Sequence, residues 1–400
     1  MIKELLSAMA IGCLFCACDS GTAPPPAAAK PDNQSKVIPV DYTLGRTMNA
    51  RLGRGINLGN SWDSDGADDS GWGNPIRDED FAIIKAAGFN SVRIPVRWQT
   101  FSDTTTHTVD PERLNGVIQD IQLAMANGLA VVVNFHHYNE LNCYGGGMPP
   151  GYNNPPDDNP TCDYLPIRFN TEKAHFLGMW AQVATALNAA FPANDMLVFE
   201  ILNEPVVKRA DVLNQIMTEA YTVIRTAAPG KTIMFESYHA AKFADLTDLQ
   251  LPADGNIIYS GHYYAPYAYS HQGHHGYKCK GDEAYGNNAS DSLRYYKNLA
   301  YRQYPDINGT DQVPLNMGEF GVAGGSFMGD CVYYDDKGQQ IGLWPSDQKK
   351  AEWAQKTVQA AIETGTSFHY WGFAHTGGFE AYNKYAETWY PGFPQALTQP

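Results

Sequence analysis

Basic residues are scarce in this chain of 400 residues. Lys and Arg together number 28 against 43 Asp and Glu, which gives a formal net charge of −15 at pH 7. Proteins bind nucleic acids and anionic membrane surfaces through clustered Lys and Arg. The composition therefore argues against a nucleic-acid partner and leaves neutral or cationic ligands as candidates.

Long apolar runs are nearly absent as well. The clearest one, Leu5 to Ala17, has about 13 residues, fewer than the roughly 20 that a membrane-spanning helix needs. After the early charge of Lys3, such a run is typical of a secretory signal peptide. Because Cys18 follows Ala17 as in bacterial lipoproteins, we expect residues 1–18 to be a signal peptide of that type. Plain secretion is the alternative to a lipid on Cys18.

Export follows from this interpretation: we expect a secreted protein or a lipoprotein of the outer membrane or cell surface of a bacterium. Contact with a membrane is then expected only through the lipid anchor. Residues 19–40 are rich in Pro, Ala and polar residues, so they cannot form a core and are predicted to be a linker. Residues 41–400 are enough for one large domain.

Cysteine is sparse in this predicted domain, where only Cys143, Cys162, Cys279 and Cys331 occur. In an exported protein, four thiols favour disulfides and allow three pairings. Proximity in sequence favours Cys143 with Cys162, across a loop rich in Gly, Pro and Asn, and then Cys279 with Cys331. The alternative is that one or both pairs stay reduced.

Short β-branched or aromatic runs alternate with longer amphipathic segments from residue 54 onward, which indicates strands connected by helices. We predict eight strands, over 54–62, 91–98, 130–138, 196–205, 232–239, 256–264, 313–321 and 367–373. Helices are predicted over 78–89, 111–128, 171–191, 210–228 and 346–365, with the weakest helical pattern in 240–255.

Eight alternating units predict an α/β fold, a (β/α)8 TIM barrel in a single catalytic domain. An open doubly wound sheet is the alternative. No Gly-rich phosphate-binding motif follows any predicted strand, which argues against a nucleotide ligand.

Polar side chains gather where the predicted strands end. The C-terminal ends of barrel strands meet at one rim, where the chemistry of such barrels takes place. Glu204 lies between Asn203 and Pro205 at the end of the fourth strand, and Glu319 lies near the end of the seventh. Because glycosidic bonds are commonly cleaved by two flanking carboxyl groups, this pair suggests a glycosidase. Structural ion pairs with arginine are the alternative.

Eight short motifs carry a family resemblance: GINLGNSW, WGNP, SVRIPVRW, VVVNFHHY, FEILNEP, HYYAPY, MGEFG and YWGF, in this order between residues 55 and 373. In order and spacing they resemble glycoside hydrolase family 5, the cellulase-type barrels. The resemblance implies that Glu204 is the acid/base, that Glu319 is the nucleophile and that no cofactor is required. It implies a supporting shell of Arg93, His136, Asn203, His262, Tyr264 and Trp371, with His137 close by. Asn57 and Trp62 are further candidates for substrate binding.

Side-chain chemistry suggests roles for several of these residues. Arg93 and Tyr264 can donate hydrogen bonds to Glu319, which would keep it ionised by lowering its pKa. His262, two residues before Tyr264 on the same face of a strand, is expected to pair with Glu204.

Glu200 shares a strand face with Glu204, so both are expected to point into the barrel. We expect Glu200 to lie deeper, as a buried carboxyl group paired with an Arg or His, with Arg93 as a candidate. Asn203 is suited to bind the sugar 2-hydroxyl. If Asn203 and Glu204 both face the substrate, the strand must twist or bulge just before Pro205.

Aromatic residues near the strand ends are candidates for contact with sugar rings. Trp371 offers a flat apolar surface for a pyranose. Trp62, Trp72, Trp98 and Tyr138 fit this role or a place in the core between barrel and helices equally well.

The adjacent histidines His136 and His137 raise a zinc alternative. Such a site needs further His and Asp ligands at strand ends, where only His262 is available besides carboxylates that suit a glycosidase. The acidic stretch 63–69 lacks EF-hand spacing and is predicted to be a polar rim loop. The histidines of 271–275 are predicted to lie in a solvated loop. We therefore expect no metal site.

The resemblance favours a retaining, endo-acting β-1,4-glucanase that hydrolyses cellulose-type, mixed-linkage or xyloglucan polysaccharides. A β-mannanase of the same fold and a non-hydrolytic, lipid-anchored glycan-binding protein are the alternatives. The stretch YWGFAHTGGF, residues 370–379, departs from the family's usual Trp followed by Asp-Asn-Gly. We expect a monomer with a β-glucan polysaccharide as its partner.

Retention has a geometric requirement. The carboxyl groups of Glu204 and Glu319 should lie roughly 5 to 5.5 Å apart, against about 6.5 to 9.5 Å for inversion. A separation of about 8 Å in the folded protein would exclude the retaining mechanism.

Overall fold

The computed structural model describes residues 37–138, 141, 166–192, 196–207, 209–272, 279, 281–282, 287–324, 331–334, 337, 340–342 and 344–400. The predicted signal peptide, the predicted lipidation site Cys18, nearly all of the predicted linker, and Cys143 with Cys162 lie outside these residues.

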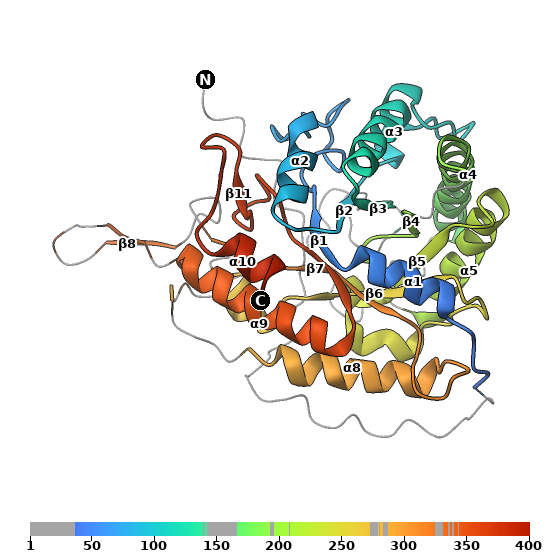
Figure 1. The fold of residues 1–400 in the computed structure, drawn as a ribbon. Coiled ribbons are helices and arrows are strands. Elements are labelled where there is room, and N and C mark those ends of the chain that lie inside the picture. Colours follow the sequence, from blue (N-terminus) through green and yellow to red (C-terminus); the bar gives the residue numbers. More distant parts are fainter. Residues whose placement is uncertain are drawn as a thin grey trace.

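Eight parallel strands close into a barrel in the order β1-β10-β7-β6-β5-β4-β3-β2 (Figure 1), which confirms the predicted TIM-barrel fold. The strands are β1 (Arg54–Asn57), β2 (Ser91–Ile94), β3 (Ala130–Asn134), β4 (Leu197–Glu200), β5 (Thr232–Glu236), β6 (Ile257–Tyr263), β7 (Leu315–Phe320) and β10 (Ser367–Tyr370). Most end several residues before the predicted limit, so the polar residues of the motifs lie on the turns that follow.

Helices surround this barrel. They are α2 (Asp78–Ala86), α3 (Pro111–Ala126), α4 (Pro166–Ala190), α5 (Ala210–Ala227), α8 (Ala289–Gln303) and α9 (Asp347–Thr364). All five predicted helices are present. The weak pattern between β5 and β6 corresponds only to α6 (Tyr238–Ala241) and the 3-10 helix η2 (Phe243–Asp248).

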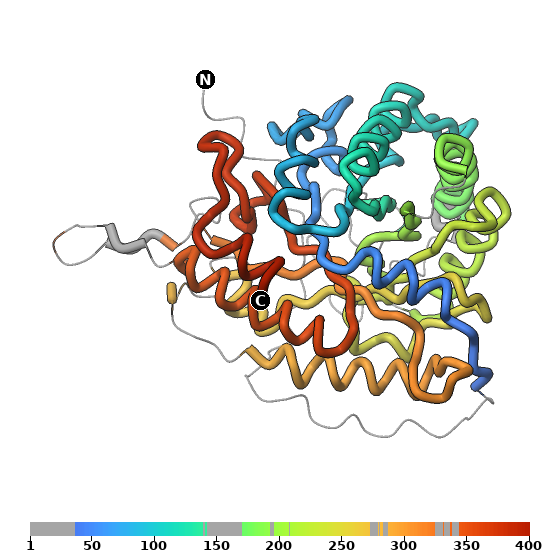
Figure 2. The backbone as a smooth tube through the Cα atoms, in the orientation of Figure 1, coloured from blue at the N-terminus to red at the C-terminus, as the bar shows by residue number. Residues whose placement is uncertain are grey.

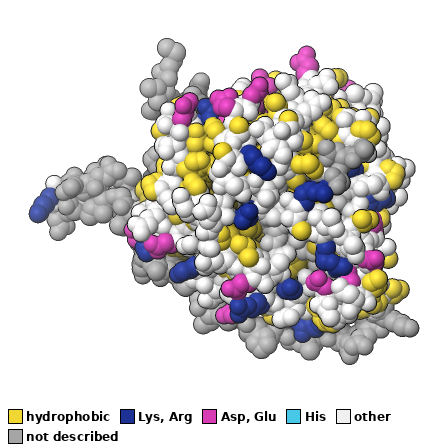
Figure 3. All heavy atoms as spheres, in the orientation of Figure 1, with side chains coloured by type: hydrophobic (Ala, Val, Ile, Leu, Met, Phe, Trp, Pro, Cys, Tyr) yellow, Lys and Arg dark blue, Asp and Glu magenta, His cyan; other side chains and the backbone are white. Residues whose placement is uncertain are grey.

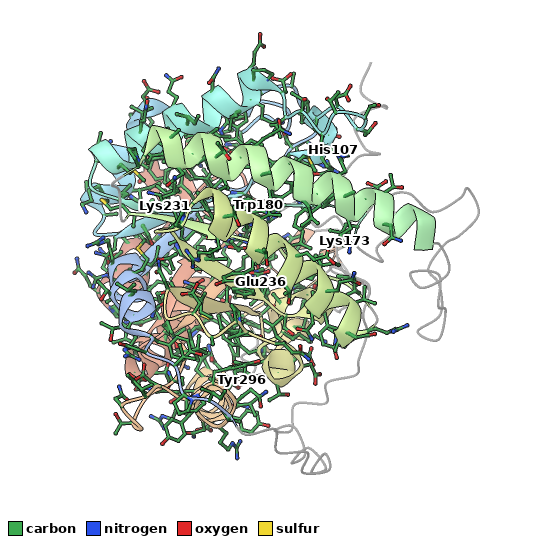
Figure 4. The ribbon with its side chains drawn as sticks, turned by 90° about the vertical axis from the view of Figure 1, so that its right-hand side faces the viewer. His107, Lys173, Trp180, Lys231, Glu236 and Tyr296 are labelled. Carbon is green, nitrogen blue, oxygen red and sulfur yellow. A yellow bond between two sulfur atoms is a disulfide. The ribbon has the colours of Figure 1, made fainter. Side chains whose placement is uncertain are left out.

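The apolar core lies between the strands and these helices. Trp180 on α4 packs against Phe135 and Phe199, and its indole N–H donates to the carbonyl oxygen of Ile201 at 3.0 Å. Figure 4 shows α4 and α5 covering the strands from this side, with Trp180 labelled. The helix is thereby fixed to the chain between β4 and Glu204.

The N-terminal end of the barrel is closed by α1 (Thr43–Leu52), which crosses in front of the strands in Figures 1 and 2. Met48 and Leu52 of this helix form a separate buried cluster with side chains of β3, β4, β5 and β6. Gly45 allows the close approach, because a Cβ there would lie 2.3 Å from the carbonyl oxygen of Ile257. Polar chemistry is therefore left to the opposite end.

Smaller elements complete the chain. They are η1 (Gln99–Phe101), α7 (Tyr267–Ser270), β8 (Val332–Tyr334), β9 (Gln340–Gly342), β11 (Tyr382–Asn383), β12 (Thr388–Trp389) and α10 (Phe393–Thr398).

A disulfide joins Cys279 and Cys331, one of the two predicted pairs. Among the described helices, none combines the length and apolar character needed to cross a bilayer. The face in Figure 3 carries basic and acidic side chains interspersed with apolar ones.

The pairing of β6 with β7 shifts by one residue at the rim. Gly261 pairs with Met317 and His262 with Glu319, so Gly318 is passed over. A Cβ on Gly318 would lie 2.7 Å from Ser260 Oγ and 3.2 Å from His262 Nε2. Glycine at this position therefore leaves room for the side chains of Ser260 and His262.

We predict that Gly318→Ala destabilises the protein by about 1–3 kcal/mol, because the added methyl group overpacks the barrel interior. Gly230→Ala is the matched control, since a Cβ at Gly230 meets no atom within 4 Å. Urea unfolding midpoints would measure both changes. Equal midpoints for the two variants would contradict the packing argument.

Candidate active site

Arg93, the third residue of β2, is fully buried and joins several parts of the rim. Its Nε and Nη2 donate to the two carboxylate oxygens of Glu200 at 2.8 and 2.7 Å. Nη1 donates to Glu319 Oε1 at 2.9 Å and to Asn57 Oδ1 at 2.8 Å, and Nη2 also donates to Asn203 Oδ1 at 2.5 Å. One guanidinium group thus orients four side chains from β1, the chain after β4, β4 itself and β7.

The predicted partner of Glu200 is therefore Arg93. Burial alone would raise the pKa of Glu200, but the charge and hydrogen bonds of Arg93 outweigh it and lower the pKa to about 2. Asn134 adds a third hydrogen bond to Glu200 at 3.0 Å. Because breaking a buried pair leaves an unpaired charge at a cost of about 3–5 kcal/mol, Glu200 and Arg93 depend on each other.

Glu204 lies on the chain beyond the end of β4 with its side chain a quarter exposed. Its φ is +44°, in the left-handed region that residues other than glycine rarely adopt. This turn supplies the predicted bend before Pro205 and lets both Asn203 and Glu204 face the rim. Its Oε1 lies 2.8 Å from Nδ1 of His262, the predicted partner.

Glu319 is held from two sides by Arg93 and by the Tyr264 hydroxyl, which donates to Oε2 at 2.9 Å. The sequence predicts that these donors lower the pKa of Glu319. That prediction is wrong, because the net shift of this pKa is upward. Burial raises the pKa of Glu319 and the charge of Glu204 adds to the rise, which together exceed the opposing effects of His262, Arg93 and Tyr264.

The two candidate catalytic carboxyl groups are close together. Single oxygens of Glu204 and Glu319, together with a ring nitrogen of His262, all lie within 4.8 Å of one another. His262 Nδ1 is 3.6 Å from Glu319 Oε2. The nearest oxygens of the two carboxyl groups are thus closer than the roughly 5 to 5.5 Å expected between the groups themselves.

Glu236, the last residue of β5, was not identified from the sequence although its strand was predicted. It is fully buried; Oε1 lies 3.0 Å from His262 Nε2, and Oε2 accepts the backbone N–H of Glu204 at 2.7 Å. Figure 4 labels it near the middle of the view. Its position as an acidic residue at the end of a predicted barrel strand was the available signal.

The three carboxyl groups around His262 determine its charge. Burial would lower the pKa of His262, but Glu319, Glu236 and Glu204 together raise it well above its ordinary value. Burial also raises the pKa of Glu236, to about 7, against the opposing charge of His262. The structure therefore holds an imidazolium between Glu236 and the two rim carboxylates.

Trp371 lies at the end of β10 as predicted, stacked on His136 with ring centroids 5.7 Å apart and planes at 2°. Gly59 gives its ring space, because a Cβ there would be 2.5 Å from it. The next residue in the chain, His137, has a φ of +57°. The ring of Trp72 approaches the His137 ring edge-on, with the ring centroids 6.0 Å apart. These aromatic rings form one side of the site.

The structure corrects the prediction that Trp62 binds substrate. It is only 6% exposed, and its indole N–H donates to Asp120 of α3 at 2.6 Å. A Cβ at Gly116 would lie 2.4 Å from its ring. Trp62 therefore packs between the rim loop and α3, because the loop after β1 folds back over that helix. Trp98 and Tyr138 are also buried in the core, which leaves Trp72 as the partly exposed member of the four.

Comparison with known proteins agrees with this geometry. A family model described as "Cellulase (glycosyl hydrolase family 5)" matches residues 53–376, most of the chain. The chain therefore belongs to glycoside hydrolase family 5, the cellulase family.

Curated relatives are distant. Endoglucanase H of Acetivibrio thermocellus is 23% identical over 359 residues, which cover 88% of this chain and 33% of the relative. Endoglucanase A of Clostridium longisporum is 24% identical over 373 residues, 88% of this chain and 62% of the relative. The chain thus spans less than two thirds of either relative.

Solved structures match over more of their length. One described as an endoglucanase has a TM-score of 0.69 and 25% identity, and the match covers 89% of this chain and 100% of that one. Thermotoga maritima Cel5A in complex with cellobiose has a TM-score of 0.68 and 27% identity, with 88% and 99% covered. The structure of the same Cel5A in complex with mannotriose has a TM-score of 0.68 and 27% identity. The match covers 88% of this chain and 99% of that one.

We predict that Glu236→Gln moves the basic limb of the kcat/KM pH profile to lower pH. Above about pH 7 Glu236 is ionised and helps to retain the proton on His262. A neutral Gln removes that effect, so the His262 imidazolium loses its proton at lower pH. At acidic pH, the kcat/KM of the variant should differ less from that of the parent.

The profile is measured against that of Glu363→Gln, an exposed glutamate paired with Arg294 far from the site. A uniform loss of activity at every pH, or identical profiles for both variants, would contradict the role of Glu236.

Proposed function

We propose that this protein is a retaining endo-β-1,4-glucanase that cleaves internal bonds of β-glucan polysaccharides. The observation that carries the proposal is the close pair of carboxyl groups, Glu204 and Glu319, with oxygens within 4.8 Å of each other. Their surroundings differ, which supports different roles. Glu319 is buried between a cation and a phenol, whereas Glu204 is partly exposed and contacts His262.

In the first step, a carboxylate oxygen of Glu319 attacks the anomeric carbon and the bond to the leaving oxygen breaks. Arg93 and Tyr264 fix the two oxygens of Glu319, so the carboxylate is oriented before substrate binds. Glu204 gives a proton to the leaving oxygen, which departs as a hydroxyl group.

In the second step, Glu204 takes a proton from water, and the resulting hydroxide oxygen displaces Glu319 from the anomeric carbon. The two inversions give net retention. His262 Nδ1 lies 2.8 Å from Glu204 Oε1 and 3.6 Å from Glu319 Oε2, so it can keep both side chains oriented during this step.

Asn203 and Trp371 supply binding contacts in this proposal. Because Asn203 Oδ1 accepts from Arg93, its amide nitrogen remains oriented to donate to the sugar 2-hydroxyl. Trp371 supports a pyranose ring on the face that His136 does not cover. His137 and Trp72 extend this wall.

Glucan is proposed as the polymer because the relatives are endoglucanases and a matching Cel5A structure holds cellobiose. A β-mannanase is the second candidate, since the same Cel5A is also described with mannotriose. We also propose export, from the signal-like residues 1–18, with a lipid on Cys18.

A polysaccharide panel tests the activity: carboxymethylcellulose, barley β-glucan, xyloglucan and mannan, with sizing of the products. We expect internal cleavage of the glucans. Glu204→Gln should lower kcat by about 10²- to 10⁴-fold, the typical contribution of a general acid or base. Glu319→Gln removes the nucleophile and should lower kcat by at least as much.

A substrate with a leaving group that needs no proton, dinitrophenyl cellobioside, separates the two roles. Glu204→Gln should still release dinitrophenol in a burst, whereas Glu319→Gln should not. Full polysaccharide activity in either variant would overturn the site, and no reducing sugar from any polymer would favour a glycan-binding protein.

A further inference from the structure

Asp63, His136 and His137 form a second polar cluster beside the catalytic carboxyl groups. One ligand atom from each of the three lies within 4.8 Å of the others. His137 Nε2 is 3.7 Å from Asp63 Oδ2. The histidines come from the chain after β3, and Asp63 comes from the acidic loop after β1.

The Asp63 carboxylate is held with one oxygen turned toward the histidines. It is fully buried, and Oδ1 accepts the backbone N–H of Ser61 at 2.8 Å. Oδ2 is buried and has no hydrogen-bond partner. The nearby Arg113 guanidinium donates instead to the carbonyl oxygens of Trp62 and Gly66. A buried carboxylate oxygen without a hydrogen bond is costly unless a ligand completes it.

The two imidazoles are suited to complete such a site. His136 is 2% exposed, and the centroid of its ring lies 4.3 Å from that of His137, with the two ring planes at 86°. His137 is fixed by Gln99, which donates to its carbonyl oxygen at 2.9 Å, and its side chain is 33% exposed. An ion can therefore reach the cluster from solvent.

We propose that Asp63, His136 and His137 bind one Zn²⁺ ion. Two imidazole nitrogens and a carboxylate oxygen form a common three-residue zinc set, with the fourth tetrahedral position left to water. Zinc requires distances of about 2.0–2.2 Å to each ligand, so the side chains close slightly around the ion. The structure thus supplies the Asp ligand that the sequence did not identify.

The ion acts as an inhibitor and not as a cofactor. His136 carries Trp371 on its face, so a bound ion lies beside the surface that supports a pyranose in the proposed function. Zn²⁺ and polysaccharide should then compete for the site. This consequence rests on the proposed glucanase activity, whereas the metal site itself does not.

Calorimetric titration of the purified protein with ZnCl₂ tests the site directly, without any activity measurement. We expect one Zn²⁺ per chain, and a Kd at least about tenfold higher in Asp63→Asn and His137→Ala. Asp65→Asn is the matched control, because Asp65 lies in the same loop but bonds Trp72. Its Kd should equal that of the parent.

Two further variants distinguish other zinc sites. Glu204→Gln removes a ligand from the second described cluster, Glu204, His262 and Glu319. A double variant, His274→Ala with His275→Ala, tests histidines outside the described residues. Binding that is lost in either of these variants but kept in Asp63→Asn would overturn the proposal, as would no binding by the parent.

Discussion

Arg93 lies inside the barrel without exposed surface, and its guanidinium bonds carboxylate and amide oxygens from β1, β4, β7 and the chain after β4. Such a charge is tolerated in the interior only with full pairing. Glu200 pairs with it through both oxygens, and the remaining donors reach the rim. The position of Glu319 therefore follows from an ion pair lower in the barrel.

The acid/base side of the site depends on a different arrangement. The left-handed backbone at Glu204 costs about 1–3 kcal/mol and persists only where its surroundings fix it. The buried carboxylate of Glu236 provides such a fixed point, because it accepts the Glu204 N–H and contacts His262 on its other oxygen. Backbone geometry and histidine charge at the site are thus linked through one side chain.

The rim also brings together groups that serve different chemistry. His136 has Trp371 on one side and the Asp63 cluster nearby, so sugar binding and metal binding would use neighbouring atoms. A site that holds oriented carboxylate and imidazole groups can contact sugar hydroxyls, and the same kinds of group are ligands for Zn²⁺. Discrimination between them depends on the loop after β1, which positions Asp63.

The sequence by itself determined the barrel and its two carboxyl groups. Strand periodicity is a local property, and the ordered motifs placed Glu204 and Glu319 at strand ends. The pairing of Arg93 with Glu200 also followed, because both point into the same interior. The resemblance placed Asn203 at the rim beside Glu204, and that placement in turn required a bend before Pro205.

Only the tertiary structure decided where the side chains of Trp62, Glu236 and Asp63 lie. Trp62 lies in a rim motif, yet the fold of its loop turns it onto α3. Glu236 and His262 meet because β5 and β6 are neighbours, with a bulge that aligns His262 with Glu319. Asp63 reaches His137 from a loop 74 residues away, a contact that depends on barrel closure and that no sequence spacing encodes.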